Sequence, residues 1–97
     1  MKDYIKSRLS ERDMLVEYVS KAKAVEIMQN QITKLEKNID ALDEDIEELE
    51  EAGLNRIVET LCKTRNSLNL ERLELKIHVC KLRLWIAEFE RARQLTR

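Results

Sequence analysis

The side chains that could perform chemistry are few and widely spaced. His78 is the only histidine, and the two cysteines, Cys62 and Cys80, stand far apart in the chain. A zinc site needs several histidine, cysteine or carboxylate ligands at short spacings, and these residues form no such group. One glycine cannot build a phosphate-binding loop, and no serine or cysteine has a recognisable base. The sequence therefore predicts no enzyme, no metal site and no other cofactor.

The spacing of the cysteines bears on redox state and location. Eighteen residues make five helical turns, so Cys62 and Cys80 share a helix face but lie ~27 Å apart, too far for an intrachain disulfide. We expect two small, buried, reduced side chains, with a disulfide between two antiparallel chains as the alternative. Because the sequence also has no apolar leader and no membrane-spanning run, we expect a cytoplasmic protein that makes no membrane contact.

Charged side chains are unevenly distributed along the chain. Residues 1–53 hold 8 basic and 14 acidic side chains, and residues 54–97 hold 10 basic and 5 acidic ones. Between residues 40 and 51 there are eight acids and no base. Acids near a helix C-terminus oppose the helix dipole, so this segment is either a solubilising surface or a contact for a protein partner. The candidate contact residues are Asp43, Glu44, Glu47, Glu48 and Glu51.

The opposite end of the sequence is basic. Lys81, Arg83, Arg91 and Arg97 are the candidates there for contacts with nucleic acid. A basic surface is the usual first sign of nucleic-acid binding. The chain as a whole has a net charge of −1, so nucleic acid remains the weaker alternative to a protein partner.

Two coiled-coil patterns must position these side chains. In the first half of the chain, apolar residues alternate steps of three and four, which is the core pattern of a coiled coil. The second half follows the same pattern, with two steps of seven where Arg65 and Arg72 stand. The two patterns are out of phase, and the single glycine, Gly53, stands between them. The first series is Val25, Met28, Ile32, Leu35, Ile39, Leu42, Ile46 and Leu49, and the second is Val58, Leu61, Leu68, Leu75, Val79, Leu82, Ile86 and Phe89.

The two patterns mirror each other about the glycine. Apolar residues of the first half can be paired with apolar residues of the second, from Leu49 with Val58 to Tyr18 with Phe89, so that the two residue numbers of every pair have the same sum. Antiparallel pairing of two helices requires such a constant sum. Gly53 is suited to cap the first helix, after which the second can begin. The sequence predicts an all-α fold: one domain, residues 1–97, forming an antiparallel two-helix coiled-coil hairpin. We expect helices at about 3–51 and 55–95, with the turn near Gly53.

Three arginines, Arg65, Arg72 and Arg93, occupy core positions of the second pattern. The pairing places Arg65 opposite Leu42, close to Asp40, Asp43 and Asp45. We therefore expect its aliphatic stem to lie on the helix contact and its guanidinium to pair with an acid. Such a polar residue also helps to fix the register of the two helices.

Toward the chain ends, each helix has more apolar residues than one partner helix can cover. A helix that is apolar on two sides must be buried on two sides, and a short two-helix chain has a small core. We therefore expect hairpins to dimerise into a four-helix bundle, as a homodimer or a tetramer. The expected oligomer interface is Leu70, Leu73, Ile77, Cys80, Leu84 and Trp85, with Ile5, Leu9, Val16 and Val19.

These features favour a non-catalytic protein–protein interaction module. We expect a small adaptor, chaperone, inhibitor or regulator of a larger, unidentified protein, and the short chain suggests a phage or mobile element as its source. One alternative is a small nucleic-acid-binding regulator that uses the basic end of the second helix. The other is a purely structural oligomerisation or spacer segment.

Overall fold

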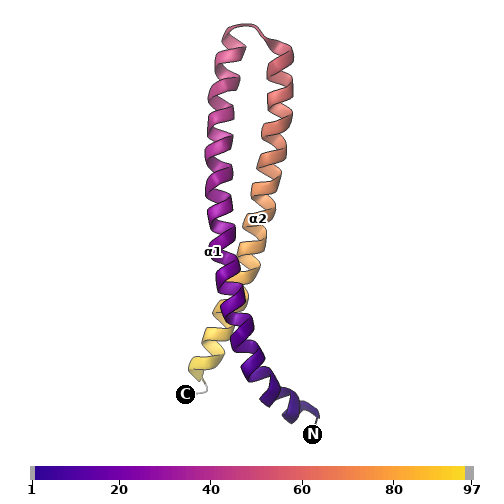
Figure 1. Ribbon diagram of the computed structural model, residues 1–97, viewed down its shortest axis with the longest axis vertical. Coiled ribbons are helices and arrows are strands. Elements are labelled where there is room, and N and C mark those ends of the chain that lie inside the picture. Colours follow the sequence, from indigo (N-terminus) through magenta and orange to yellow (C-terminus); the bar gives the residue numbers. More distant parts are fainter. Residues whose placement is uncertain (1, 96–97) are drawn as a thin grey trace.

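The chain forms two long antiparallel helices joined by a tight turn (Figure 1). The computed structural model describes the backbone of residues 2–95 and the side chains of residues 12–95. Helix α1 spans Lys2–Glu51 and helix α2 spans Asn55–Leu95. Together they make a rod of 71 × 23 × 16 Å. The predicted antiparallel two-helix hairpin is confirmed.

Hydrogen bonds at the end of α1 explain why the chain reverses at Gly53. The Leu54 N–H donates to the Leu49 carbonyl and the Gly53 N–H donates to the Glu50 carbonyl, each at 3.0 Å. These two bonds form the Schellman motif, which satisfies carbonyls that a helix end otherwise leaves unpaired. The motif needs a left-handed residue, and Gly53 has φ 76°. The predicted capping role of Gly53 is therefore confirmed.

Replacing Gly53 with alanine is expected to lower the free energy of unfolding by about 1 kcal/mol. Among the described residues other than Gly53 and its two chain neighbours, nothing lies within 4 Å of the position of the new Cβ, so the cost arises from the left-handed backbone. Gly53→Asn is the matched control and should cost less, because asparagine enters this conformation more readily. Urea unfolding followed by circular dichroism measures both variants. A Gly53→Ala variant as stable as the wild type would contradict this account of the turn.

The contact between the helices is a single row of apolar side chains, which we call the inner seam. It consists of the residues of the two coiled-coil patterns. Its most buried members, each at most 9% exposed, are Ile32, Ile39, Ile46, Val58 and Val79. Other members, such as Leu35 and Leu75, are half-buried, because one partner helix covers only one side of them. The core is therefore one layer thick.

Side-chain contacts confirm the register of the hairpin. The register predicted from the sequence places Tyr18 opposite Phe89. Their rings stack with the centroids 4.9 Å apart. The Tyr18 hydroxyl donates to the neighbouring Glu90 carboxylate at 2.7 Å. Nearer the turn, Arg65 Nη1 lies 3.1 Å from Asp43 Oδ1. The predicted pairing of this arginine with an acid of the other helix is confirmed.

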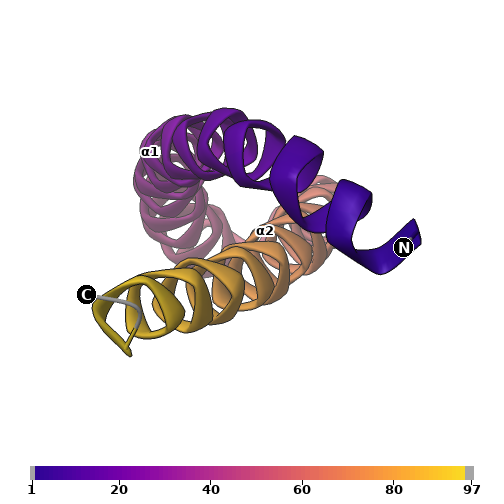
Figure 2. The ribbon, with the colours of Figure 1, turned by 90° about the horizontal axis from the view of Figure 1, so that it is seen from below.

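The helices cross and then separate toward the chain ends. In the lower part of Figure 1, α1 passes across α2, and the view from below in Figure 2 shows the two ends pointing in different directions. Met14 continues the core pattern of α1, yet it is 41% exposed. The separation of the helices therefore leaves more apolar surface uncovered at this end than the heptad pattern alone indicates.

Candidate functional site

The expected interface residues of α2 form an exposed apolar stripe, which we call the outer stripe: Leu70, Leu73, Ile77, Cys80 and Leu84. The three leucines are 57%, 54% and 64% exposed in chain order, and Ile77 is 48% exposed. At about 100° per helical residue, the outer stripe points roughly 160° away from the inner-seam residues of α2. Helix α2 therefore has apolar residues on two opposite faces, and the hairpin covers only one of them.

The two cysteines lie in different environments. Cys62 is half-buried, with Arg65 Nη2 3.9 Å from its Sγ, whereas Cys80 is exposed. The expectation that both thiols are buried is wrong for Cys80 in the single hairpin, because this residue belongs to the outer stripe and not to the inner seam. Both thiols are free.

Trp85, the sixth expected interface residue of α2, is half-buried by contacts within the hairpin. Its ring stacks on Phe89 with centroids 5.4 Å apart, and the Lys21 ammonium lies 4.5 Å from its centroid. Tyr18 also stacks on Phe89. Its hydroxyl donates a hydrogen bond to the Glu90 carboxylate, and this bond, together with the negative charge of Glu90, raises the pKa of Tyr18. This cluster joins α1 to α2 close to the point where the helices separate, so Trp85 already has a structural role in the hairpin.

Helix α1 carries a second uncovered apolar surface. Val16 and Val19 are 63% and 64% exposed, and their helical positions point away from α2. The other two expected interface residues of this helix, Ile5 and Leu9, have side chains outside the described residues. The structure thus gathers five of the six α2 candidates into one stripe, and it places Val16 and Val19 of α1 on the opposite side of the rod.

The acidic candidates gather near the turn, and we call them the acidic tip: Asp43, Glu44, Glu47, Glu48 and Glu51. All five are exposed. Asp43 pairs with Arg65, whereas the four glutamates take part in none of the ion pairs found among residues 12–95. Helix α1 has no basic residue in its last turn and α2 has no acid in its first. Neither helix end at the turn therefore has the charges that its dipole favours.

The basic candidates do not form one surface. Lys81, Arg83 and Arg91 are exposed, and Arg97 lies outside the described residues. Two residues along a helix correspond to a rotation of about 200°, so Lys81 and Arg83 point to different sides of α2. The exposed Glu88 and Glu90 follow them in the sequence, which further dilutes the positive charge.

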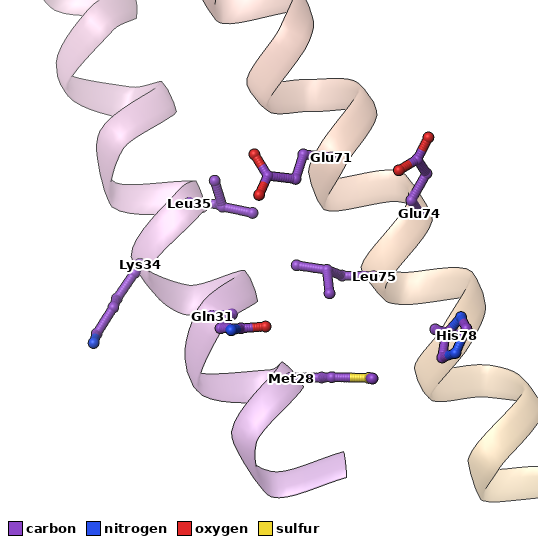
Figure 3. A pocket seen from close by; sticks show the side chains of 8 residues that line it. All are labelled: Met28, Gln31, Lys34, Leu35, Glu71, Glu74, Leu75 and His78. Carbon is purple, nitrogen blue, oxygen red and sulfur yellow. The ribbon is translucent and has the colours of Figure 1, made fainter. Parts of the chain in front are cut away.

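A groove of about 490 Å³ lies between the helices in the middle of the rod (Figure 3). Its lining residues are Met28, Gln31, Lys34, Leu35, Glu71, Glu74, Leu75 and His78. In Figure 3, Met28, Leu35 and Leu75 point across the gap between the helices, whereas Lys34 points away from it. Within the part of the chain that the structure describes, no three metal-binding side chains come together. We regard this groove, which the sequence did not indicate, as a gap in side-chain packing.

Neither helix, over its described residues, has a segment long and apolar enough to cross a membrane. Comparisons of this chain with protein-family models, with curated proteins and with solved structures gave no match. Among residues 12–95, three surfaces stand out as uncovered: the outer stripe, the surface around Val16 and Val19, and the acidic tip.

Proposed function

We propose that this chain is a non-catalytic protein–protein interaction module: a small adaptor, chaperone, inhibitor or regulator of a larger protein. The outer stripe is the main support for an interaction module as such, because its four large apolar side chains are each about half exposed on a face that the hairpin leaves uncovered. Contiguous exposed apolar surface marks sites of protein contact. The two free thiols suit a reducing compartment, and we propose the cytoplasm.

The acidic tip offers a second surface of different chemistry. It lies at one end of the rod, in a segment with eight acids and no base (Figure 1). Each acid near the C-terminus of α1 costs a few tenths of a kcal/mol or more through the helix dipole, so stability does not account for this concentration of charge. A basic surface on a larger protein has the complementary charge.

Changing the four glutamates of the acidic tip to glutamine is expected to preserve the fold and abolish partner binding. The variant E44Q/E47Q/E48Q/E51Q keeps Asp43 and its ion pair with Arg65. The free energy of unfolding should rise by roughly 1 kcal/mol, because unfavourable helix-dipole interactions are removed. The matched control, E26Q/E36Q/E71Q/E88Q, removes the same charge from elsewhere on the rod.

The measurement is affinity capture from native cell extract with mass spectrometry, at low and high salt and after nuclease treatment. We expect the wild type and the control to capture one stoichiometric protein that survives nuclease, and the tip variant to lose it. If the tip variant still captured the partner, the acids would be interpreted as a solubilising surface and not as the contact. Salt-labile, nuclease-sensitive recovery of nucleic acid would instead support the nucleic-acid alternative. Capture of nothing but the chain itself would support a spacer or oligomerisation segment.

A further inference from the structure

The outer stripe has the spacing of a second coiled-coil core. Its members are separated by steps of three and four, and the exposed Ala87 extends the series by one more step. The series is about 25 Å long. The next positions in the pattern on either side are polar, Asn66 and Arg91. The face is therefore limited in length and centred on the middle of the rod.

We propose that the outer stripe packs against the outer stripe of a second copy of this chain, in antiparallel orientation, with the two-fold axis between His78 and Val79. This inference rests on the proposed interaction function and names one of its partners. Two-fold symmetry lets one patch serve both copies, because a contact from one residue to another is repeated in reverse. The facing pairs across the axis are Leu70 with Ala87, Leu73 with Leu84, and Ile77 with Cys80.

The sizes of the side chains favour the antiparallel orientation. Across the axis, a large residue faces a small one in two of the three kinds of layer, and Leu73 faces Leu84 in the third, so the layers differ less in volume than they would in a parallel dimer. A parallel dimer would place two Ala87 side chains in one layer and two Leu84 side chains in the next. Neighbouring layers would then need different helix spacings, which close packing does not permit.

The charge of the two ends of the rod favours the same orientation. Residues 40–67 hold nine acidic and three basic side chains, whereas residues 2–26 and 81–95 together hold seven acidic and ten basic ones. A parallel dimer would bring the two acidic ends together, but an antiparallel dimer sets each acidic end beside a basic one. The charges that flank the outer stripe do not distinguish the orientations. On the flanks of the stripe in the antiparallel dimer, Glu74 lies beside Lys81 of the second copy, but Lys76 lies beside Arg83.

This dimer differs from a square four-helix bundle. Because the outer stripe points away from α1, the two α2 helices form the centre and the two α1 helices lie outside them, in a row of four. Val16 and Val19 remain uncovered on the outer helices. The dimer therefore keeps apolar surface available for a further partner.

Cysteine cross-linking of the full chain tests both the pairing and its direction. The variant C62A keeps Cys80, which lies three residues, or about 4.5 Å along the helix axis, from its copy across the two-fold axis. A short bismaleimide should convert this 11.5 kDa chain into a species of twice the mass. Two further variants combine C62A and C80A with either L70C or A87C. After they are mixed, unfolded and refolded together, we expect these two to cross-link with each other.

Neither L70C nor A87C should cross-link with itself, since its copy lies about 25 Å away along the axis. Cross-linking of L70C with itself would overturn the antiparallel orientation. A monomer in sedimentation velocity, with Cys80 not cross-linked in C62A, would overturn self-association. The C62A variant leaves the outer stripe intact, so it decides self-association even if L70C or A87C weakens the dimer. The affinity-capture experiment with the acidic-tip variant tests the proposed function separately. A chain that is monomeric could still bind a larger protein, and a chain that dimerises could bind none.

Discussion

The triple substitution Leu73→Asp, Ile77→Asp and Leu84→Asp is expected to abolish self-association, leaving an 11.5 kDa monomer or an unfolded chain. These side chains are about half exposed in the hairpin, so they add little to its own core. In the dimer each would be buried, and a buried carboxylate without a partner costs on the order of 2 kcal/mol or more. Six of them in a pair of chains exceed the roughly 8 kcal/mol that holds a micromolar dimer together.

A second triple variant provides the control for this experiment. Thr60→Asp, Thr64→Asp and Ser67→Asp add the same three charges to exposed positions of α2 outside the outer stripe, and they should leave the dimer intact. Sedimentation velocity gives the mass, and circular dichroism gives the helix content. A dimer that survives the outer-stripe substitutions would exclude this stripe as its interface. Loss of helix together with the dimer would show that α2 is stable only when both of its apolar faces are covered.

Truncating Ile39 to alanine is expected to lower the free energy of unfolding by about 2–5 kcal/mol. Ile39 is 5% exposed, and because the inner seam is one layer thick, no second layer of side chains can move in to fill the cavity. The loss is a large share of the roughly 5–15 kcal/mol that stabilises a typical domain. Urea unfolding followed by circular dichroism measures it. Protein concentration must be held constant, since dimerisation makes the apparent stability depend on it.

Ile27→Ala is the matched control for the core substitution. It makes the same chemical change in the same helix, but Ile27 is 49% exposed. We expect its free energy of unfolding to change by less than about 0.5 kcal/mol. Equal losses at the two positions would contradict the register of the inner seam.

Most of the hairpin can be predicted from the spacing of apolar residues. In a helix, the direction of a side chain depends only on its position along the chain, so steps of three and four identify the inner seam. The change of phase at Gly53 identifies the turn. The constant pairing of the two patterns then places Tyr18 on Phe89 and brings Arg65 to the acids of the other helix, where the structure has them.

Features that depend on more than helical position could not be predicted in the same way. The contact of Lys21 with Trp85 depends on how close the helices remain where they begin to separate, and a heptad pattern contains no such distance. Cys80 was expected to be buried because a sequence shows that a helix face is apolar, but not which chain covers it. For the same reason, the sequence grouped Val16 and Val19 with the outer stripe, although they lie on the opposite side of the rod.

The one-layer core has a consequence for the order in which the chain folds. Arg65 and Asp43 are 22 residues apart, whereas Tyr18 and Glu90, near the other end, are 72 apart. The entropy lost on closing a loop grows with its length, and each pair that forms near Gly53 shortens the loop that the next pair must close. We therefore expect the hairpin to close from the turn outward, with contacts near Ile46 and Val58 forming first. Amide exchange should be slowest near these residues and fastest beyond Tyr18 and Phe89, where the helices separate.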